Sequence, residues 1–225
     1  MRHLTIALVP LVAALALLGC GGAPAPVPGA EPAWTPVADP GFLDQLAATY
    51  RFRLGRPSAL EVLPDGSGVL FLRSGPRSFE RALYRFDPAT GQAHELLTAA
   101  TLLGGGAETL TAEEKARRER LRLAAKGIAR YRLSADGKRL LVLLSGRPFV
   151  YDLATKQATD VLGADAEPVQ DAHLSPDGAR LAFVRGGELF WTPVADAKPV
   201  QLTTGASDTV SFGLAEFVAQ EEMGR

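Results

Sequence analysis

Three stretches of the chain repeat one order of turn-forming and apolar residues. Each contains an Asp-Gly turn, then an apolar strand, then a second turn and an aromatic-rich strand. The turns are Leu63–Gly66, Ser134–Gly137 and Ser175–Gly178. Asp-Gly beside apolar runs is a strong hairpin signal, because both residues tolerate a positive φ. The pattern therefore predicts a series of antiparallel hairpins.

The expected strands fall at matching offsets after each turn. The first strands are Val69–Leu72, Leu140–Leu144 and Leu181–Val184, and the second are Leu83–Phe86, Phe149–Leu153 and Glu188–Thr192. A third strand edge follows at Leu96–Thr98, Val161–Leu162 and Gln201–Thr203. This order is typical of a β-propeller blade. We expect an all-β fold, a partial β-propeller of about three blades and the start of a fourth.

The spacing of the turns locates an insertion. Asp136 and Asp177 are 41 residues apart, which suits one blade, whereas Asp65 and Asp136 are 71 apart. The excess lies between Leu102 and Gly127.

This insertion has the sequence of a charged helix. Thr111 and Glu114 form a capping-box pattern, and Gly127 is a natural stop. Glu113–Arg117 and Glu114–Arg118 are i,i+4 pairs in the favourable order. Residues 113–126 carry six basic and three acidic groups. A nucleic-acid or partner patch is one interpretation, and a solvated surface helix is the one we prefer for a chain of neutral total charge.

The N-terminus has the pattern of an export signal. A basic start, Met1–His3, precedes the apolar run Leu4–Leu18, which is short for a bilayer span and suited to a signal peptide. The run ends at Cys20, the single cysteine of the chain, and resembles a bacterial lipobox. Six prolines between residues 23 and 40 predict a semi-rigid tether. A plain signal peptide with a chance cysteine is the alternative.

These features predict three parts: a signal peptide at 1–19, a lipidated Cys20 with its tether at 20–40, and an incomplete propeller at 41–225. Gly21 and Gly22 after the cysteine lack the Asp that would retain a lipoprotein at the inner membrane. By resemblance to that sorting rule, we expect export across the inner membrane and a lipid anchor in the outer membrane, on its periplasmic or surface face.

Composition and net charge reduce the classes of protein to which this chain can belong. The 225 residues are 47% hydrophobic, and 24 Lys and Arg against 25 Asp and Glu give a net charge of −1. No basic surplus points to nucleic acid. A single cysteine excludes an internal disulfide framework.

The motifs of self-sufficient catalysis are missing from the sequence. It contains no G-x-S-x-G nucleophile elbow, H-E-x-x-H motif, C-x-x-C motif or acidic calcium loop. His94 and His173 are expected to be structural or exposed. We therefore expect no metal, no cofactor and no catalytic residue in this chain.

One acidic pair near the C-terminus is the candidate binding site. Glu221 and Glu222 close a short segment that has helical character. Such a pair is commonly a solvated face. Two carboxylates held together away from water would instead bind an ammonium group through charge-assisted hydrogen bonds.

Several strings resemble bacterial dipeptidyl peptidase IV-like enzymes of the prolyl oligopeptidase family of serine peptidases. They are Phe52–Arg56, Phe71–Pro76, Glu113–Arg120 and, most specific, Ala215–Glu222. The resemblance implies that Glu221 and Glu222 bind the free α-amino group of a peptide substrate. It implies release of N-terminal dipeptides with proline or alanine in second position. It also implies a catalytic α/β-hydrolase domain that this sequence lacks.

The resemblance leaves two points open. In that family a propeller arginine also holds the substrate, and Arg147 is a candidate that no motif secures. Whether the chain is part of an active enzyme is likewise open. The leading hypothesis is the substrate-gating propeller part of a serine dipeptidyl peptidase. The alternatives are a non-enzymatic propeller lipoprotein resembling the TolB type of binding scaffold, and a degenerate gene product.

Overall fold

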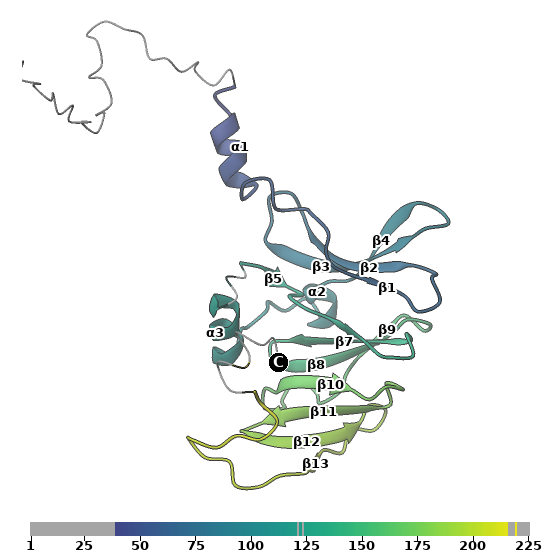
Figure 1. Cartoon of the computed structure of the whole chain (residues 1–225), viewed down its shortest axis with the longest axis vertical. Coiled ribbons are helices and arrows are strands. Elements are labelled where there is room, and N and C mark those ends of the chain that lie inside the picture. The colour runs from purple at the N-terminus through teal and green to yellow at the C-terminus, as the bar shows by residue number, and fades with distance from the viewer. Residues whose placement is uncertain (1–38, 121, 123, 216–218, 220–225) are drawn as a thin grey trace, which may run out of the picture. The chain divides into compact units, whose positions relative to one another are not determined.

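The computed structural model describes residues 39–120, 122, 124–215 and 219 (Figure 1). The chain divides into two units, Met1–Pro40 and Gly41–Arg225. All sheets belong to the second unit. Cys20, Glu221 and Glu222, the predicted lipid anchor and amine-binding pair, lie outside the described residues.

The described residues of this unit form three sheets, each built on a four-stranded antiparallel meander in chain order, and a short fifth strand joins the first sheet. The first contains β1 (Ser58–Val62), β2 (Val69–Ser74), β3 (Glu80–Asp87) and β4 (Gln92–Leu97). The second contains β6 (Arg132–Leu133), β7 (Arg139–Leu144), β8 (Arg147–Asp152) and β9 (Gln157–Asp160). The third contains β10 (Gln170–Leu174), β11 (Arg180–Arg185), β12 (Glu188–Pro193) and β13 (Val200–Gln201). The predicted all-β, partial propeller fold is confirmed.

The Asp-Gly turns join the first and second strands of each sheet. In the second sheet, the Gly137 amide donates to the Ser134 carbonyl at 2.9 Å, and the Ser134 hydroxyl donates to Asp136 at 2.6 Å. Of these two residues only the glycine takes a positive φ (+71° at Gly137). The aspartate instead accepts local hydrogen bonds, which fix the turn.

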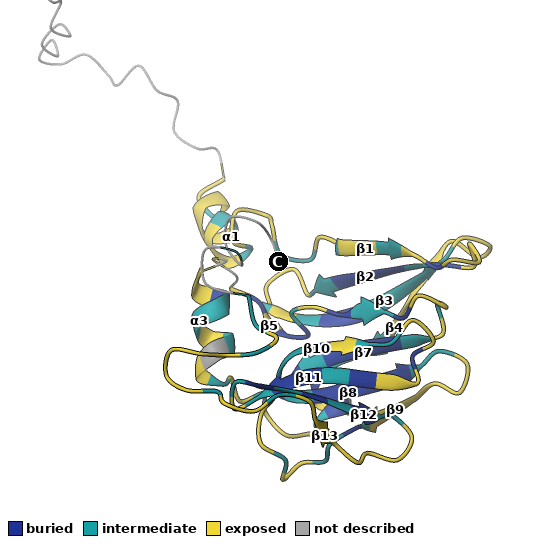
Figure 2. Ribbon diagram, turned by 60° about the horizontal axis from the view of Figure 1, so that its bottom comes forward, coloured by how far each residue is buried: buried dark blue, intermediate teal, exposed yellow. Residues whose placement is uncertain are grey.

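The apolar residues of β7 are mostly buried (Figure 2), and they belong to two clusters, one on each face of the second sheet. One cluster joins it to the first sheet and contains Leu70, Leu72, Leu140 and Val142. The other joins it to the third sheet and contains Leu141, Leu181 and Phe183. Because neighbouring residues of β7 serve opposite clusters, a one-residue register slip would exchange the two faces.

The predicted strand positions need correction at the third strand of each repeat. β4 and β9 begin earlier than expected, and Val161 follows β9 instead of lying in it. His94, expected to be structural or exposed, is an exposed residue of β4 paired with Arg85. Beyond β13 the described residues form one isolated bridge, Ser207–Val210, so they show no fourth sheet. The rest of that prediction falls outside the described residues.

Among the described residues, three helices accompany the sheets: α1 (Phe42–Ala48), α2 (Ala99–Leu102) and α3 (Ala112–Arg120). α2 and α3 lie in the segment between the first and second sheets, as the insertion requires. That segment ends in β5 (Lys126–Gly127), which pairs in parallel with the start of β3. No helix among the described residues is long and apolar enough to cross a bilayer.

Candidate functional site

Within the insertion between Leu102 and Gly127, the segment from Glu108 to Gly127 departs from the blade pattern of the three sheets. Its helix α3 begins as predicted, because the Thr111 hydroxyl accepts the Glu114 amide at 3.1 Å. It ends at Arg120, well before Gly127. The expectation that Gly127 stops the helix is therefore wrong.

Gly127 instead lets two strands approach each other. Its φ is +69°, and a Cβ at this position would lie 2.7 Å from the carbonyl oxygen of Arg81. Glycine alone satisfies both conditions without strain. The residue therefore fixes the end of the insertion against β3.

A buried arginine holds the insertion together. The side chain of Arg118 is 7% exposed, and its guanidinium contacts Glu108 at 2.6 Å and Glu114 at 2.7 Å. It also donates to the carbonyl of Ala125 at 2.9 Å, while Glu108 accepts the Gly127 amide at 2.8 Å. The predicted Glu114–Arg118 pair is confirmed, but its arginine is not part of a solvated face.

The surroundings shift the pKa values of this cluster. Burial by itself would lower the pKa of Arg118, but hydrogen bonds to Glu108 and Glu114 outweigh it and raise that pKa. Burial likewise opposes the ionised form of Glu114, yet hydrogen bonds from Arg117 and Arg118 leave its pKa below the ordinary value. Both groups are therefore charged at neutral pH.

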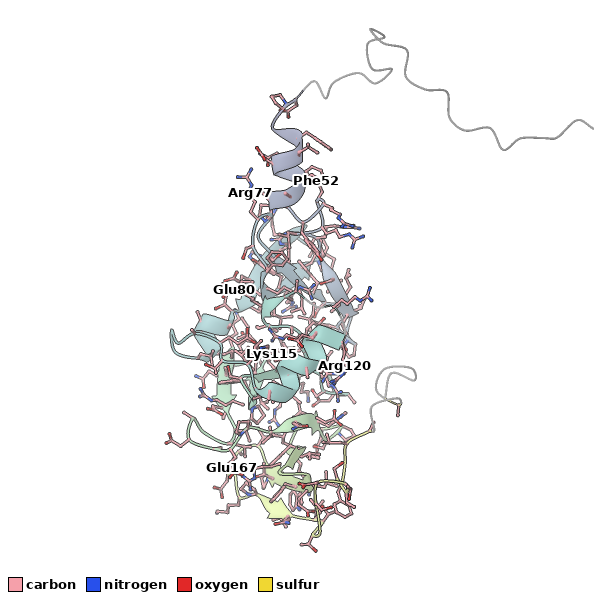
Figure 3. All side chains as sticks on the ribbon, turned by 90° about the vertical axis from the view of Figure 1, so that its left-hand side faces the viewer. Phe52, Arg77, Glu80, Lys115, Arg120 and Glu167 are labelled. Carbon is pink, nitrogen blue, oxygen red and sulfur yellow. The ribbon has the colours of Figure 1, made fainter. Side chains whose placement is uncertain are left out.

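A cavity of about 800 Å³ lies against this cluster, bounded by the insertion, the start of α2 and the start of β3. Its wall combines small apolar side chains with charged groups of both signs. The charged lining residues apart from the Arg118 cluster are Glu80, Lys115, Glu119, Arg122 and Lys126. None of these five makes an ion pair with another described residue. Figure 3 labels Glu80 on β3 and Lys115 on α3.

Chemically, this cavity is suited to a ligand with both charges. Its volume falls in the range of small-molecule and short-peptide sites. Carboxylates and cations on the wall complement an amine and an acid, while the Tyr50 and Leu110 side chains provide apolar contact. The sequence pattern did not reveal it, because its lining comes from segments as far apart as Tyr50 and Lys126.

The other candidate residues lie apart from this cavity. Arg147 on β8 donates to Asp160 at 2.9 Å and stacks over Phe149, with its guanidinium carbon 5.0 Å from the ring centre. It is thus engaged within its own sheet. His173 on β10 is half exposed and contacts Asp171 at 3.0 Å. Within the described ranges, no three His, Cys, Asp or Glu side chains gather as a metal site.

Comparison with known proteins gives two findings. Residues 134–225 match the family described as the dipeptidyl peptidase IV (DPP IV) N-terminal region. A crystal structure of Porphyromonas gingivalis dipeptidyl peptidase 4 is similar, with a TM-score of 0.49 and 21% sequence identity over 81% of this chain. The aligned part is 24% of that structure, so the chain spans about a quarter of its length.

The family match covers β7 to β13, which is the third sheet and all of the second except β6, and extends over the Ala215–Glu222 string. The resemblance predicted from the sequence is therefore confirmed for this part of the chain: residues 134–225 are similar to the N-terminal region of dipeptidyl peptidase IV.

Proposed function

We propose that this chain, whose residues 134–225 match the N-terminal region of dipeptidyl peptidase IV, is the substrate-gating propeller part of a serine dipeptidyl peptidase. In this proposal Glu221 and Glu222 bind the free α-amino group of a peptide. The bond after the second residue is then presented to a catalytic serine in an α/β-hydrolase domain. The observation that carries the proposal is the family match, which includes the Glu221–Glu222 pair.

The physical logic of the pair is selection by charge. An ammonium group between two carboxylates makes charge-assisted hydrogen bonds, which are about twice as strong as neutral ones. An acylated N-terminus has no such charge and leaves the carboxylates unpaired. The site would therefore discriminate free from blocked peptides, whatever their side chains.

Binding by the full chain tests the proposal directly. The probes are the tripeptide Ala-Pro-Ala and its N-acetylated form, titrated by calorimetry at neutral pH. We expect saturable binding of the free peptide, with at least tenfold weaker binding of the acetylated one. Glu221→Gln should remove this preference.

The matched control is Glu167→Gln, because Glu167 is an exposed acidic residue of the same chain (Figure 3). It should leave both affinities unchanged. Equal affinity for the two peptides, or a preference that survives Glu221→Gln, would refute the amine-binding role and favour a scaffold of the TolB type.

Hydrolysis provides an independent test. Without a nucleophile, a base or oxyanion donors, the chain should release no p-nitroaniline from Gly-Pro-p-nitroanilide. Joined to an α/β-hydrolase domain, it should release p-nitroaniline in a reaction that N-acetylation of the substrate blocks.

We further propose that Cys20 carries a lipid anchor and that residues 21–40 tether the propeller to the outer membrane. The supporting observation is the apolar run that ends at the single cysteine. Cells grown with labelled palmitate should incorporate label into the wild-type chain and not into Cys20→Ala. Equal labelling of the two would disprove the anchor.

A further inference from the structure

Three arginines surround a second, small cavity where α3 approaches the second and third sheets. Arg117 comes from α3, Arg130 lies two residues before β6, and Arg132 is the first residue of β6. The cavity has a volume of about 30 Å³. Its apolar wall is formed by Leu141, Leu143, Ala129 and Ala172, and the remaining lining residues are Glu114 and Tyr131. This volume admits a head group of a few atoms, not a whole peptide.

Two of the three arginines already have acidic partners. Arg117 donates to both carboxylate oxygens of Glu114, at 2.7 and 2.8 Å. Arg132 lies 3.7 Å from the Asp171 carboxylate and 2.6 Å from Nε2 of His173. Their guanidinium groups are therefore held in place.

Arg130 differs from both neighbours. It makes no hydrogen bond and no ion pair with any other described residue. Arg130 is an exposed residue, and its partial burial, followed by repulsion from Arg132 and Arg117, lowers its pKa despite the attraction of Asp171 and Glu114. A planar guanidinium presents up to five donors, and those of Arg130 have no acceptor among the described side chains.

The charge balance of the region decides which ligand fits. Four guanidinium groups (Arg117, Arg118, Arg130 and Arg132) face three carboxylates, those of Glu108, Glu114 and Asp171. The surplus is one positive charge. A carboxylate brings one negative charge and matches the guanidinium fork with two parallel hydrogen bonds. A phosphate dianion would exceed the surplus.

We propose that the cavity formed by Arg117, Arg130 and Arg132 binds a single carboxylate group of a ligand, with Arg130 as its principal donor. The apolar wall formed by Leu141 and Leu143 limits water on one side, which strengthens the ion pair. Arg117 and Arg132 add positive potential without leaving their own partners. The proposal stands independently of Glu221 and Glu222, because it uses other residues and a ligand group of opposite charge.

The test uses the full chain and the Nε–Hε signals of its arginines in NMR spectra. Sodium acetate is added to the protein in steps at neutral pH. A parallel titration with sodium chloride at the same ionic strength is the control. We expect a saturable shift of the Arg130 signal with acetate only. Arg130→Gln should weaken acetate binding at least tenfold, and Arg130→Lys, which keeps the charge but loses the fork, should weaken it less.

Two comparisons make the outcome decisive. Arg77→Gln removes an exposed arginine near α1 and should leave acetate binding unchanged (Figure 3). Inorganic phosphate should bind no tighter than acetate. Absence of a saturable acetate shift in the wild type, tighter binding of phosphate, or unchanged binding in a folded Arg130→Gln variant would each overturn the proposal.

Two peptides then separate the sources of the carboxylate. Acetyl-Ala-Ala with a free C-terminus carries the group at a chain end, and acetyl-Glu-amide carries it on a side chain. Competition of either with acetate at Arg130 supports the site and identifies the source. Competition by the uncharged acetyl-Ala-Ala-amide would overturn it.

Discussion

The interfaces between the sheets and the insertion between Glu108 and Gly127 are held together by different forces. Between the second and third sheets, Leu181 and Phe183 are completely buried, and Phe183 stacks on Phe190 with ring centres 5.6 Å apart. In the insertion, the buried group is the guanidinium of Arg118, bonded to two carboxylates and a carbonyl.

This difference sets how each region tolerates change. Apolar burial contributes about 25 cal/mol per Å² and has no direction, so a similar side chain can replace the original. An ionic cluster depends on geometry, because removing one member leaves the others buried and uncompensated. Substitutions that remove side-chain volume should therefore destabilise the sheet interfaces. Substitutions that break an ion pair should destabilise the insertion.

The largest expected effect is in the sheet interface. Phe183→Ala removes a fully buried ring and should lower the free energy of unfolding by about 3–5 kcal/mol. Phe52→Ala is the matched control, since the Phe52 side chain is half exposed, and should cost less than about 0.5 kcal/mol. Urea denaturation of the two full-length variants measures both values. Similar losses in the two would contradict the assignment of the core.

The next effect tests the insertion. Arg118→Ala leaves Glu108 buried without its cation and should cost about 2–4 kcal/mol. Arg117→Ala, one position earlier and with a quarter of its side chain exposed, should cost less than about 1 kcal/mol. The triple change Arg118→Met, Glu108→Gln and Glu114→Gln should recover most of the loss. If Arg118→Ala behaves like Arg117→Ala, the ionic cluster does not hold the insertion.

The sequence was informative where structure repeats at short range. The apolar run from Leu140 to Leu144, its counterparts in the other repeats and the three Asp-Gly turns were sufficient to predict the second strand of each sheet. The ends of the repeats were harder to place, because β9 and β13 are short and exposed and lack an apolar pattern. Their positions follow from pairing with β8 and β12.

Long-range contacts explain what the sequence could not show in the insertion. The charged helix sequence has the composition of a solvated face, and nothing local distinguishes Arg118 from Arg117. Arg118 is buried because Glu108 and Ala125 meet it from outside the helix. The cavity beside it likewise depends on chain segments that the sequence does not bring together. The Glu221–Glu222 prediction remains a prediction.

The smallest expected effect is a change of stability with pH, which distinguishes the insertion from the sheet interfaces. The pKa of Glu114 in the folded chain lies below its ordinary value, so its ion pairs stabilise the fold fully above that ordinary value. This stabilisation is lost as the pH falls through the lower, folded pKa. Glu114→Gln should therefore cost up to about 1 kcal/mol at pH 7 and progressively less in acid. Phe183→Ala should show no such convergence with the wild type, since no charge is removed.

The measurement is the urea midpoint of each variant between pH 7 and pH 3, with Glu167→Gln as the control, because its side chain is 81% exposed. A constant difference between wild type and Glu114→Gln across this range would mean that Glu114 acts through packing, and that the insertion is held in the same way as the sheets.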